Sequence, residues 1–364
     1  MGKKGKKSNK SNVDVNINLP FISICTPTFN RRPFIPIMIK CFEHQTYPKD
    51  KIEWIIVDDG TDKIEDLIKH IPQIKYFKYD EKLSLGKKRN IANDNSSGEI
   101  IIFMDDDDYY PPERFSHAVD TLLKNPDALC AGSSAMFIYF KHINKMYQFG
   151  PYAPSHATAA TFAFKRELLK QTRFNELSCV AEEKQFLKDY TIPFVQLESL
   201  KSILVFSHVH NSFDKKELLA QMPNPHVHET VLKASDIVKE PEILKFFTVD
   251  IDILLSKYDF GNTKHKPDVV KQLAEIKKTR DEMMNKQIAY QNSMQLLNNP
   301  QILQSKINDL TNTINYLTIE NSELKDKVQY LDNKIKQIIT DHIEKKKSVK
   351  EADQTTTGPT ITII

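Results

Sequence analysis

The segment 100–108, which reads IIIFMDDDD, constrains the fold more than any other part of the chain. Its short, isoleucine-rich apolar run is typical of a strand buried on both faces of a parallel sheet. Four aspartates, Asp105 to Asp108, follow directly, so we expect them at the carboxyl end of that strand, the edge where open α/β sheets bind ligands. Unit charges about 4 Å apart repel by roughly 4 kcal/mol at an effective dielectric near 20. We therefore expect a divalent cation at this edge.

The acidic run has two other interpretations. A solvated acidic loop is the usual role of a charge run, but it does not explain why the acids directly follow a buried strand. A second acidic turn, VDDGT at 57–61, also follows an apolar run. An EF-hand calcium loop is excluded, because Tyr109 and Tyr110 occupy the positions of its third ligand and its turn glycine.

Strands and helices alternate over residues 21–207, which predicts an α/β fold with a doubly wound, mostly parallel sheet. Strands are expected at 21–26, 52–57, 74–79, 99–104, 128–133, 161–164 and 203–207, with a hairpin at 136–149. Helices are expected at 33–45, 63–70, 86–95, 112–125 and 181–189. The less regular pieces after residue 135 are expected to form the wall that faces a second substrate.

Composition divides the chain into five parts: a disordered basic tail (1–19), the sheet domain (20–211), a proline-broken helical region (212–299), a coiled coil (300–346) and a disordered tail (347–364). With a net charge of only +3, no nucleic-acid partner is expected. No stretch is apolar enough for a signal peptide or a membrane span, and four scattered cysteines indicate reduced thiols. We expect a cytoplasmic protein, and the Ile, Lys and Asn bias is typical of an AT-rich genome such as that of a large DNA virus or a protist.

A heptad pattern runs through residues 307–338. Apolar residues recur every seven positions at a and d, with Asn321 at one a position. β-branched residues at a with Leu at d favour a parallel two-stranded coil, and a buried Asn fixes its register. We therefore expect a parallel homodimer through residues 301–342, the alternative being a lone amphipathic helix packed on the sheet domain.

Four segments taken together resemble the successive motifs of the family 2 glycosyltransferases, inverting enzymes of the GT-A fold. They are TPTFNRR (26–32), VDDGT (57–61), LGKKRNIANDNSSGE (85–99) and FMDDDDYYPPER (103–114). Each motif is weak alone, but their order and spacing over residues 20–207 are specific. The resemblance implies a Rossmann-like GT-A domain that uses a nucleotide-sugar donor, most often a UDP-sugar, with Mn²⁺ or Mg²⁺ as cofactor.

The resemblance also implies which residues bind the donor. The second acid of the VDDGT turn contacts the nucleotide base or ribose, and the end of the first strand lines the same pocket. In the Asp-x-Asp element, Asp107 is the expected metal ligand and Asp105 contacts ribose or metal. The basic helix segment neutralises phosphate, unless its side chains are merely solvated. The expected donor-binding residues are Thr26, Pro27, Asn30, Asp59, Lys88, Arg89, Asp105 and Asp106.

The general base and a further metal ligand are expected later in the chain. Family members carry Glu-Asp at the start of a late helix, and the segment CVAEEKQFL (179–187) offers Glu183 as the base with Glu182 beside it. Glu replaces the usual Asp here, and a solvated helix start with acids favoured by the dipole is the alternative. His208 and His210 would share one face if their segment were a strand, and either is a candidate metal ligand.

The function expected is metal-dependent, inverting transfer of a sugar to the hydroxyl of a glycan, protein or small-molecule acceptor. A sugar-nucleotide pyrophosphorylase would need a glycine-rich loop after the first strand, and TPTFNRR has no glycine. A catalytically inactive GT-A scaffold that acts through its coiled coil is the other alternative, which the intact acidic motifs disfavour.

Overall fold

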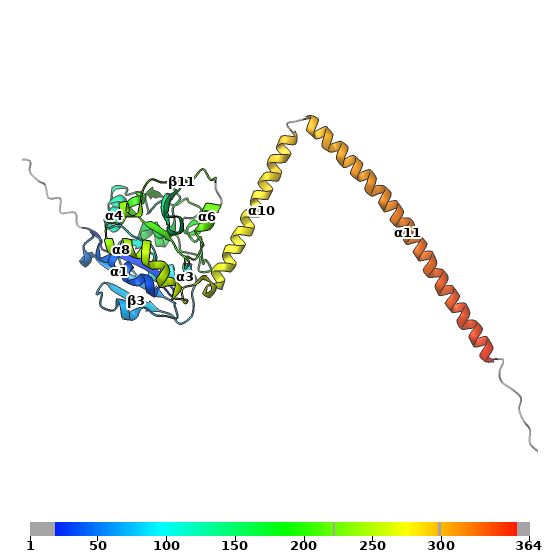
Figure 1. Cartoon of the computed structure of the whole chain (residues 1–364), viewed down its shortest axis with the longest axis horizontal. Coiled ribbons are helices and arrows are strands. Elements are labelled where there is room, and N and C mark those ends of the chain that lie inside the picture. The colour runs from blue at the N-terminus through cyan, green and yellow to red at the C-terminus, as the bar shows by residue number, and fades with distance from the viewer. Residues whose placement is uncertain (1–18, 221–222, 298–299, 355–364) are drawn as a thin grey trace, which may run out of the picture. The chain divides into compact units, whose positions relative to one another are not determined.

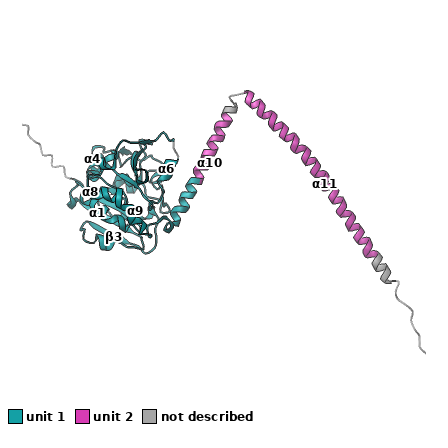
Figure 2. Cartoon of the chain, in the orientation of Figure 1, with its two compact units in different colours: residues 1–277 teal, residues 278–364 magenta. Residues whose placement is uncertain are grey.

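The computed structural model describes residues 19–220, 223–297 and 300–354. The chain divides into two compact units, residues 1–277 and 278–364 (Figure 2). The first unit holds two sheets and the helices packed on them (Figure 1). The helical segment after residue 211 is therefore part of the same compact unit as the sheet domain, as far as Lys277. Residues 1–18 of the tail expected at 1–19, and residues 355–364 of the tail expected at 347–364, lie outside the described residues.

The main sheet has seven strands in the described part of the chain, in the order β3-β2-β1-β4-β8-β5-β9. In sheet order, the strands are β3 (Ile74–Lys78), β2 (Ile52–Asp58), β1 (Ile22–Thr28), β4 (Ile100–Phe103), β8 (Ala163–Lys165), β5 (Cys130–Gly132) and β9 (Phe194–Gln196). The first four are mutually parallel, while β8 runs antiparallel to both β4 and β5. The mostly parallel α/β sheet expected from the alternating pattern is confirmed.

The register explains why two acidic turns meet at one edge. Ile22 of β1 pairs with Ile52 of β2 on one side and with Ile100 of β4 on the other. The three strands run in the same direction, so the VDDGT turn after β2 and the aspartates after β4 emerge at the same edge. The chain order reverses at β1, which makes this edge a topological switch point, where α/β sheets bind ligands.

The central strands are apolar on both faces because helices cover both faces. Ile24 and Ile102 join one apolar cluster with α1 and α4, whereas Cys25 and Ile101 join a second with α3 and α5. All four side chains are fully buried. The covering helices are α1 (Ile35–Glu43), α2 (Glu65–Ile68), α3 (Leu85–Asp94), α4 (Arg114–Lys124) and α5 (Glu183–Phe186).

A second sheet of four strands, in the order β10-β6-β7-β11, lies beside the first. Its strands are β6 (Met136–Phe140), β7 (Lys145–Phe149), β10 (Leu204–Ser207) and β11 (Val227–Glu229), of which β6 and β7 form the expected hairpin. Helices from beyond residue 211 contribute to a third apolar cluster with β6 and β10, in which Phe206 stacks on Phe247 at 4.0 Å between ring centroids. They are α7 (Ala234–Ile237), α8 (Pro241–Lys245), the π-helical η7 (Phe246–Asp250) and α9 (Ile251–Ser256), whereas α6 (Lys216–Ala220) packs against the first cluster.

Short 3₁₀ turns connect these elements. They are η1 (Arg32–Phe34), η2 (Lys49–Lys51), η3 (Lys141–Ile143), η4 (Ala159–Thr161), η5 (Arg166–Lys170), η6 (Ser199–Lys201) and η8 (Thr263–His265). Two local expectations were wrong. The helix expected at 181–189 is only the single turn α5. Strand β9 was not expected, because the turn signals and the alternation of apolar and polar residues in its segment are too weak to identify a strand of three residues.

Two long helices follow, α10 (Pro267–Leu297) and α11 (Pro300–Gln354). The a and d positions of the heptad pattern form an apolar seam along α11, and this seam is exposed to solvent. Its nine apolar residues between 307 and 338 are 47–66 % exposed. The helix continues to Gln354, past residue 346 where the coiled coil was expected to end. No described helix is long and apolar enough to cross a membrane.

Candidate active site

A cavity of about 320 Å³ lies where the main sheet presents its acidic edge. This volume is at the lower end of the range for small-molecule sites, about 300–1,000 Å³. Its walls come from the end of β1, the segment before and within α3, the acidic turn after β4, and segments beyond residue 178. The polar lining residues that matter below are Arg31, Lys82, Lys88, Asp105, Asp106, Asp107, Asp108, Ser212, Lys215, Lys266 and Asp268.

Two buried tyrosines hold the acidic quartet, Asp105 to Asp108, in place. The hydroxyl of Tyr110 accepts a hydrogen bond of 2.8 Å from the backbone N–H of Asp105. Tyr109 forms an antiparallel bridge to Leu204 of β10, and its hydroxyl donates to Glu240 at 3.0 Å. The residues that ruled out a calcium loop thus tie the quartet to both sheets.

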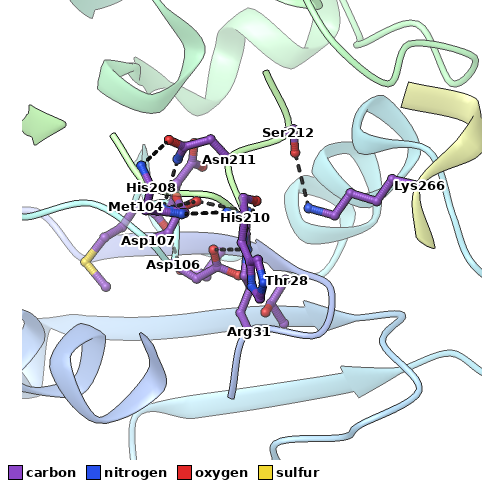
Figure 3. Close-up of polar contacts among 12 residues, drawn as sticks. Thr28, Arg31, Met104, Asp106, Asp107, His208, His210, Asn211, Ser212 and Lys266 are labelled. Carbon is purple, nitrogen blue, oxygen red and sulfur yellow. Dashed lines mark hydrogen bonds and ion pairs between the residues drawn. The ribbon is translucent and has the colours of Figure 1, made fainter. Parts of the chain in front are cut away.

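Arg31 pairs with the middle of the quartet (Figure 3). Its Nη2 lies 2.9 Å from Oδ2 of Asp107, and its Nε lies 3.5 Å from Oδ1 of Asp106. Its Nη1 donates to the carbonyl oxygen of His210 at 2.8 Å. The side chain is buried. Arg31 was not among the expected site residues, because an arginine in a loop carries no signal that identifies partners distant in the chain.

The four carboxyl groups differ in acidity. Burial raises the pKa values of Asp105, Asp106 and Asp108, that of Asp106 to about 7. Burial also opposes ionisation of Asp107, but Arg31 and His208 outweigh it and hold the pKa of Asp107 below its usual range. Asp107 is therefore the member of the quartet that is most firmly anionic at neutral pH, as a cation ligand must be.

His208 follows β10 and contacts Asp107. Its Nε2 lies 3.3 Å from Oδ2 of Asp107, and its Nδ1 accepts from the backbone N–H of His210. Burial lowers the pKa of His208 to about 4, so the ring is neutral at pH 7. The side chain of Asn211 contacts the same Nε2 at 2.9 Å.

His210 is placed differently. Strand β10 ends at Ser207, so the two histidines lie in a turn and the condition that they share a strand face is not met. Burial lowers the pKa of His210 to about 4, and its Nδ1 is buried with no hydrogen-bond partner among the described residues. Of the two candidates, the structure brings His208 to the quartet.

Arg89 connects the quartet to the acid pair at the start of α5. Its Nε donates to Oε1 of Glu182 at 2.7 Å, and its Nη2 lies 3.4 Å from Oδ1 of Asp105. The guanidinium is buried, with its carbon 4.5 Å from the ring centroid of Phe103. Arg89 is thus a link between carboxylates and sits behind the cavity wall, rather than in the phosphate-facing position that was expected.

Glu183 is left with a free carboxylate. Whereas Glu182 is paired with Arg89, the Glu183 side chain forms no ion pair with any described residue. Burial, with Glu182 as a second cause, raises the pKa of Glu183 to about 7. The preceding Ala181 has φ 54°, a left-handed conformation uncommon for a residue with a Cβ, which turns the chain just before the two acids. A carboxylate with a pKa near 7 is suited to act as a general base.

Asp59 and Lys88 bind each other. Nζ of Lys88 donates to Oδ1 of Asp59 at 2.7 Å and to the carbonyl oxygen of Thr28 at 3.1 Å, while Oδ2 of Asp59 accepts from the backbone N–H of Leu83. Asp59 is 1 % exposed and lies behind Lys88, which lines the cavity. Contact of Asp59 with a nucleotide base or ribose stays a prediction and would require this pair to open.

The three residues expected from the first strand lie in different surroundings. Pro27 lines the cavity. The Thr26 hydroxyl is used within the sheet, donating to the carbonyl of Met104 and accepting from the indole N–H of Trp54. Asn30, at φ 52°, accepts from the backbone N–H of Asp62 and donates to the carbonyl of Phe260, so it braces the turn after β2. Of these three, only Pro27 is among the residues that line the cavity within the described part of the chain.

Two lysines beyond the sheet domain complete the cavity, and neither was expected from the sequence. Lys215 is half-buried, and Lys266 is 4 % exposed. Burial, with Arg31 as a second cause, lowers the pKa of Lys266 to about 7. A lysine next to a proline at a helix start gives no sequence signal of burial, and only folding of this segment onto the sheet domain reveals it.

Asp107 and His208 are the predicted cation ligands that the structure brings into contact. Among the described residues there is no group of three or more His, Cys, Asp or Glu side chains able to hold a metal ion. The pair formed by Oδ2 of Asp107 and Nε2 of His208 is separated by 3.3 Å. Adjacent ligands about 2.1 Å from an octahedral cation lie about 3.0 Å apart. Because Nδ1 of the neutral His208 ring accepts a hydrogen bond, Nε2 carries the proton that faces Asp107 in this arrangement. Binding of a cation by these two residues stays a prediction and would require that proton to leave Nε2.

The fold and the site define the class of this protein: an α/β domain of the GT-A type, with an acidic edge at the switch point of a mostly parallel sheet. The model of the family described as "Glycosyl transferase family 2" matches residues 23–190, the span from β1 to just past α5. This segment of the chain is therefore similar to the family 2 glycosyltransferases, as the order and spacing of its motifs predicted.

Similarity to individual proteins is lower and partial. The chain is 30 % identical over 178 residues to a GalNAc(5)-diNAcBac-PP-undecaprenol beta-1,3-glucosyltransferase of Campylobacter jejuni, covering 43 % of this chain and 56 % of that protein. It is 30 % identical over 109 residues to the poly(ribitol-phosphate) beta-N-acetylglucosaminyltransferase TarS of Staphylococcus aureus, covering 26 % and 18 %. An AMP deaminase of Dictyostelium discoideum is 24 % identical over 165 residues, covering 42 % and 20 %. The chain thus spans between 18 % and 56 % of the length of these relatives.

Two solved structures resemble part of the chain. The mannosyltransferase PcManGT from Pyrobaculum calidifontis, in complex with GDP-Man and Mn²⁺, has a TM-score of 0.42 at 19 % identity and covers 51 % of this chain and 56 % of its own. TarS 1–349 of S. aureus in complex with UDP-GlcNAc has a TM-score of 0.41 at 21 % identity and covers 51 % and 58 %.

Proposed function

We propose that this chain is an inverting glycosyltransferase that transfers a sugar from a nucleoside-diphosphate sugar, with UDP-sugars first among the donors, to the hydroxyl of a glycan, protein or small-molecule acceptor. One observation carries the proposal: Arg89 binds both Glu182 and Asp105. This contact links the acid pair at α5 to the quartet after β4 and supports a single site, although neither glutamate is among the described residues that line the cavity. The match of residues 23–190 to the model of a family whose name describes glycosyl transfer supports this function.

In this proposal Glu183 is the general base. Its carboxylate accepts the proton of the acceptor hydroxyl as that oxygen forms a bond to the anomeric carbon. On the opposite face, the bond from the anomeric carbon to the diphosphate oxygen breaks, so the configuration inverts. Glu182 is less suited to the role because its carboxylate is held by Arg89.

The negative charge that develops on the nucleoside diphosphate needs a counter-charge. Asp107 and His208 would hold a divalent cation, Mn²⁺ or Mg²⁺, which when bound would neutralise the diphosphate oxygens. Asp105, which also faces the cavity, and His210 are the other two predicted ligands. In the described structure Asp105 is paired with Arg89, and the His210 imidazole does not face the cavity.

We also propose that the chain is a parallel homodimer joined through α11. A second copy would cover the exposed a and d seam, and the flanking charges are complementary: Glu320 at g faces Lys325 at e of the partner, and Lys327 at g faces Asp332. The open seam of α11 supports this, because an apolar stripe of that length is unfavourable in water.

The test is a nucleotide-sugar turnover screen with UDP-, GDP- and TDP-sugars in the presence of Mn²⁺. Wild type should release nucleoside diphosphate from at least one donor, and Glu183→Gln should bind that donor but turn it over far more slowly. Glu167→Gln, an exposed acid outside the cavity, is the matched control and should behave as wild type. Donor binding without turnover in the wild type, with any acceptor tried, would favour the inactive scaffold instead.

A further inference from the structure

The cations that line the cavity are not equivalent. Among the described residues they are Arg31, Lys82, Lys88, Lys215 and Lys266. The first three are each held by a carboxylate within 4 Å. Lys215 and Lys266 form no ion pair with any described residue. The cavity therefore contains two basic side chains that have no carboxylate of the described residues within ion-pair distance.

Lys266 is the more unusual of the two because it is almost completely buried. Only 4 % of its surface is exposed, and its ammonium contacts the Ser212 hydroxyl at 3.3 Å (Figure 3). An ammonium group carries three N–H donors, and one neutral hydroxyl does not satisfy them. A buried charge without a partner is destabilising, so such a group is expected to meet an anion in the functional state.

The two lysines also lie where an anion would need them. Lys215 and Lys266 line the same cavity as the four aspartates of the quartet. Lys266 interacts electrostatically with Asp106 and Asp107, and Lys215 with Asp107 and Asp108. A diphosphate that enters this cavity would therefore meet both lysines.

The residues first expected to neutralise phosphate are already engaged. Lys88 is bound to Asp59 and to a backbone carbonyl, and Arg89 is bound to Glu182 and Asp105. Neither has an ammonium or guanidinium group that is free of a carboxylate. Phosphate binding by these two would require breaking buried ion pairs, whereas Lys215 and Lys266 would gain a partner without losing one.

We propose that Lys215 and Lys266 form a two-lysine clamp that binds the diphosphate of the nucleotide donor. The inference rests on the proposed function in taking a nucleoside diphosphate as the ligand. Both residues lie outside the family-matched segment 23–190. The part of the chain between residues 212 and 277 is therefore a component of the donor site, in addition to a connection to the long helices.

The experiment is isothermal titration calorimetry on the full chain with Mn²⁺ present, using UDP, GDP, uridine and inorganic pyrophosphate as probes. Charge-assisted hydrogen bonds predict that Lys266→Met and Lys215→Met each weaken UDP and pyrophosphate binding by about 10- to 100-fold. Uridine, which has no phosphate, should bind both variants as it binds wild type. Lys266→Arg, which keeps the charge, should recover part of the affinity.

Lys264→Met is the matched control. Lys264 lies two residues from Lys266, but its side chain is 60 % exposed and pairs with Asp259 at 2.7 Å. It should bind every probe as wild type does. Lys266→Met should in addition melt no lower than wild type without ligand, because it removes a buried charge, while UDP should raise its melting temperature less.

The outcomes separate this inference from the proposed function. UDP and pyrophosphate binding that is unchanged in Lys215→Met and Lys266→Met would overturn the clamp and leave the glycosyltransferase proposal standing. Lysine-dependent binding of pyrophosphate with no binding of any nucleoside diphosphate would keep the anion site but overturn the proposed donor. Equal losses for uridine and UDP would show a general structural effect and would also overturn the clamp.

Discussion

Arg89 and Glu182 are joined by a hydrogen bond of 2.7 Å between two side chains that are both buried. The same guanidinium reaches Asp105 at 3.4 Å. This contact assigns different roles to two neighbouring glutamates: Glu182 is fixed by a cation, and Glu183 keeps a carboxylate that can accept a proton. It also sets the position of α5 relative to the quartet after β4.

The first prediction concerns the stability of this link. Arg89→Met would leave two carboxylates without their cation, and breaking a buried ion pair in this way costs about 3–5 kcal/mol. Urea unfolding should show a loss of that size in the free energy of unfolding. Arg173→Met is the control, because Arg173 pairs with Asp94 at the surface with both side chains about half exposed, and such pairs contribute about 0–1 kcal/mol. Similar losses in the two variants would contradict the structural role of Arg89.

The second prediction concerns pH. A general base must be deprotonated, and the pKa of Glu183 is raised to about 7, so kcat/KM should fall tenfold for each pH unit below about 7. In Glu183→Gln this fall of kcat/KM below pH 7 should disappear. The rate should drop by about 10²- to 10⁴-fold, the usual effect of general base catalysis. A pH profile that is unchanged in Glu183→Gln would move the role to another residue, with Glu182 first.

Glu183→Gln should also change the stability of the protein, and in the opposite direction to its activity. Because the folded-state pKa of Glu183 lies above its usual value, the stability it contributes is present at low pH and is lost as the pH rises toward and through 7. Glu183→Gln should therefore melt higher than wild type at pH 8. The difference should shrink as the pH is lowered toward 4.5, and a difference that is independent of pH would contradict the raised pKa.

The third prediction concerns the metal. If Asp107 holds a cation that bridges the diphosphate, UDP binding measured by calorimetry should need Mn²⁺ or Mg²⁺ and should weaken sharply in Asp107→Ala. Asp127→Ala removes an exposed acid outside the cavity and serves as the control. UDP affinity that is the same with and without a chelator would rule out the metal assignment.

The fourth prediction concerns assembly. Full-length protein should be a dimer in light scattering, and a chain that ends at residue 299 should be a soluble monomer that still binds nucleotide, because it keeps Lys215 and Lys266. Asn321→Leu should stabilise the coiled coil but weaken its preference for two helices over a larger number. Asn333→Leu, on the same helix but outside the seam, should change neither property. A full-length chain that stays monomeric at micromolar concentration would contradict the coiled coil.

The sequence alone determined the α/β class, the order of the elements from residue 21 to 207 apart from strand β9, and the position of the acidic quartet. These features follow from local signals: an apolar run identifies a buried strand, and the residue after a strand lies at its carboxyl end. Parallel pairing of β1, β2 and β4 then places the two acidic turns at one edge. Local pattern is therefore enough to locate Asp105, Asp106 and Asp107 at the cavity, where the fold does place them.

Only the tertiary structure decided how the charged side chains are paired. Arg31 with Asp107, Arg89 with Glu182, and Lys88 with Asp59 join residues that are far apart in the chain, so no local pattern could identify them. The same is true of Lys266, which reads as an ordinary lysine before a proline and becomes a buried cation only when its segment packs against the sheet domain. Strand and helix periodicity reports which face of an element is buried, whereas the partner of a charge depends on side chains that three-dimensional packing brings together.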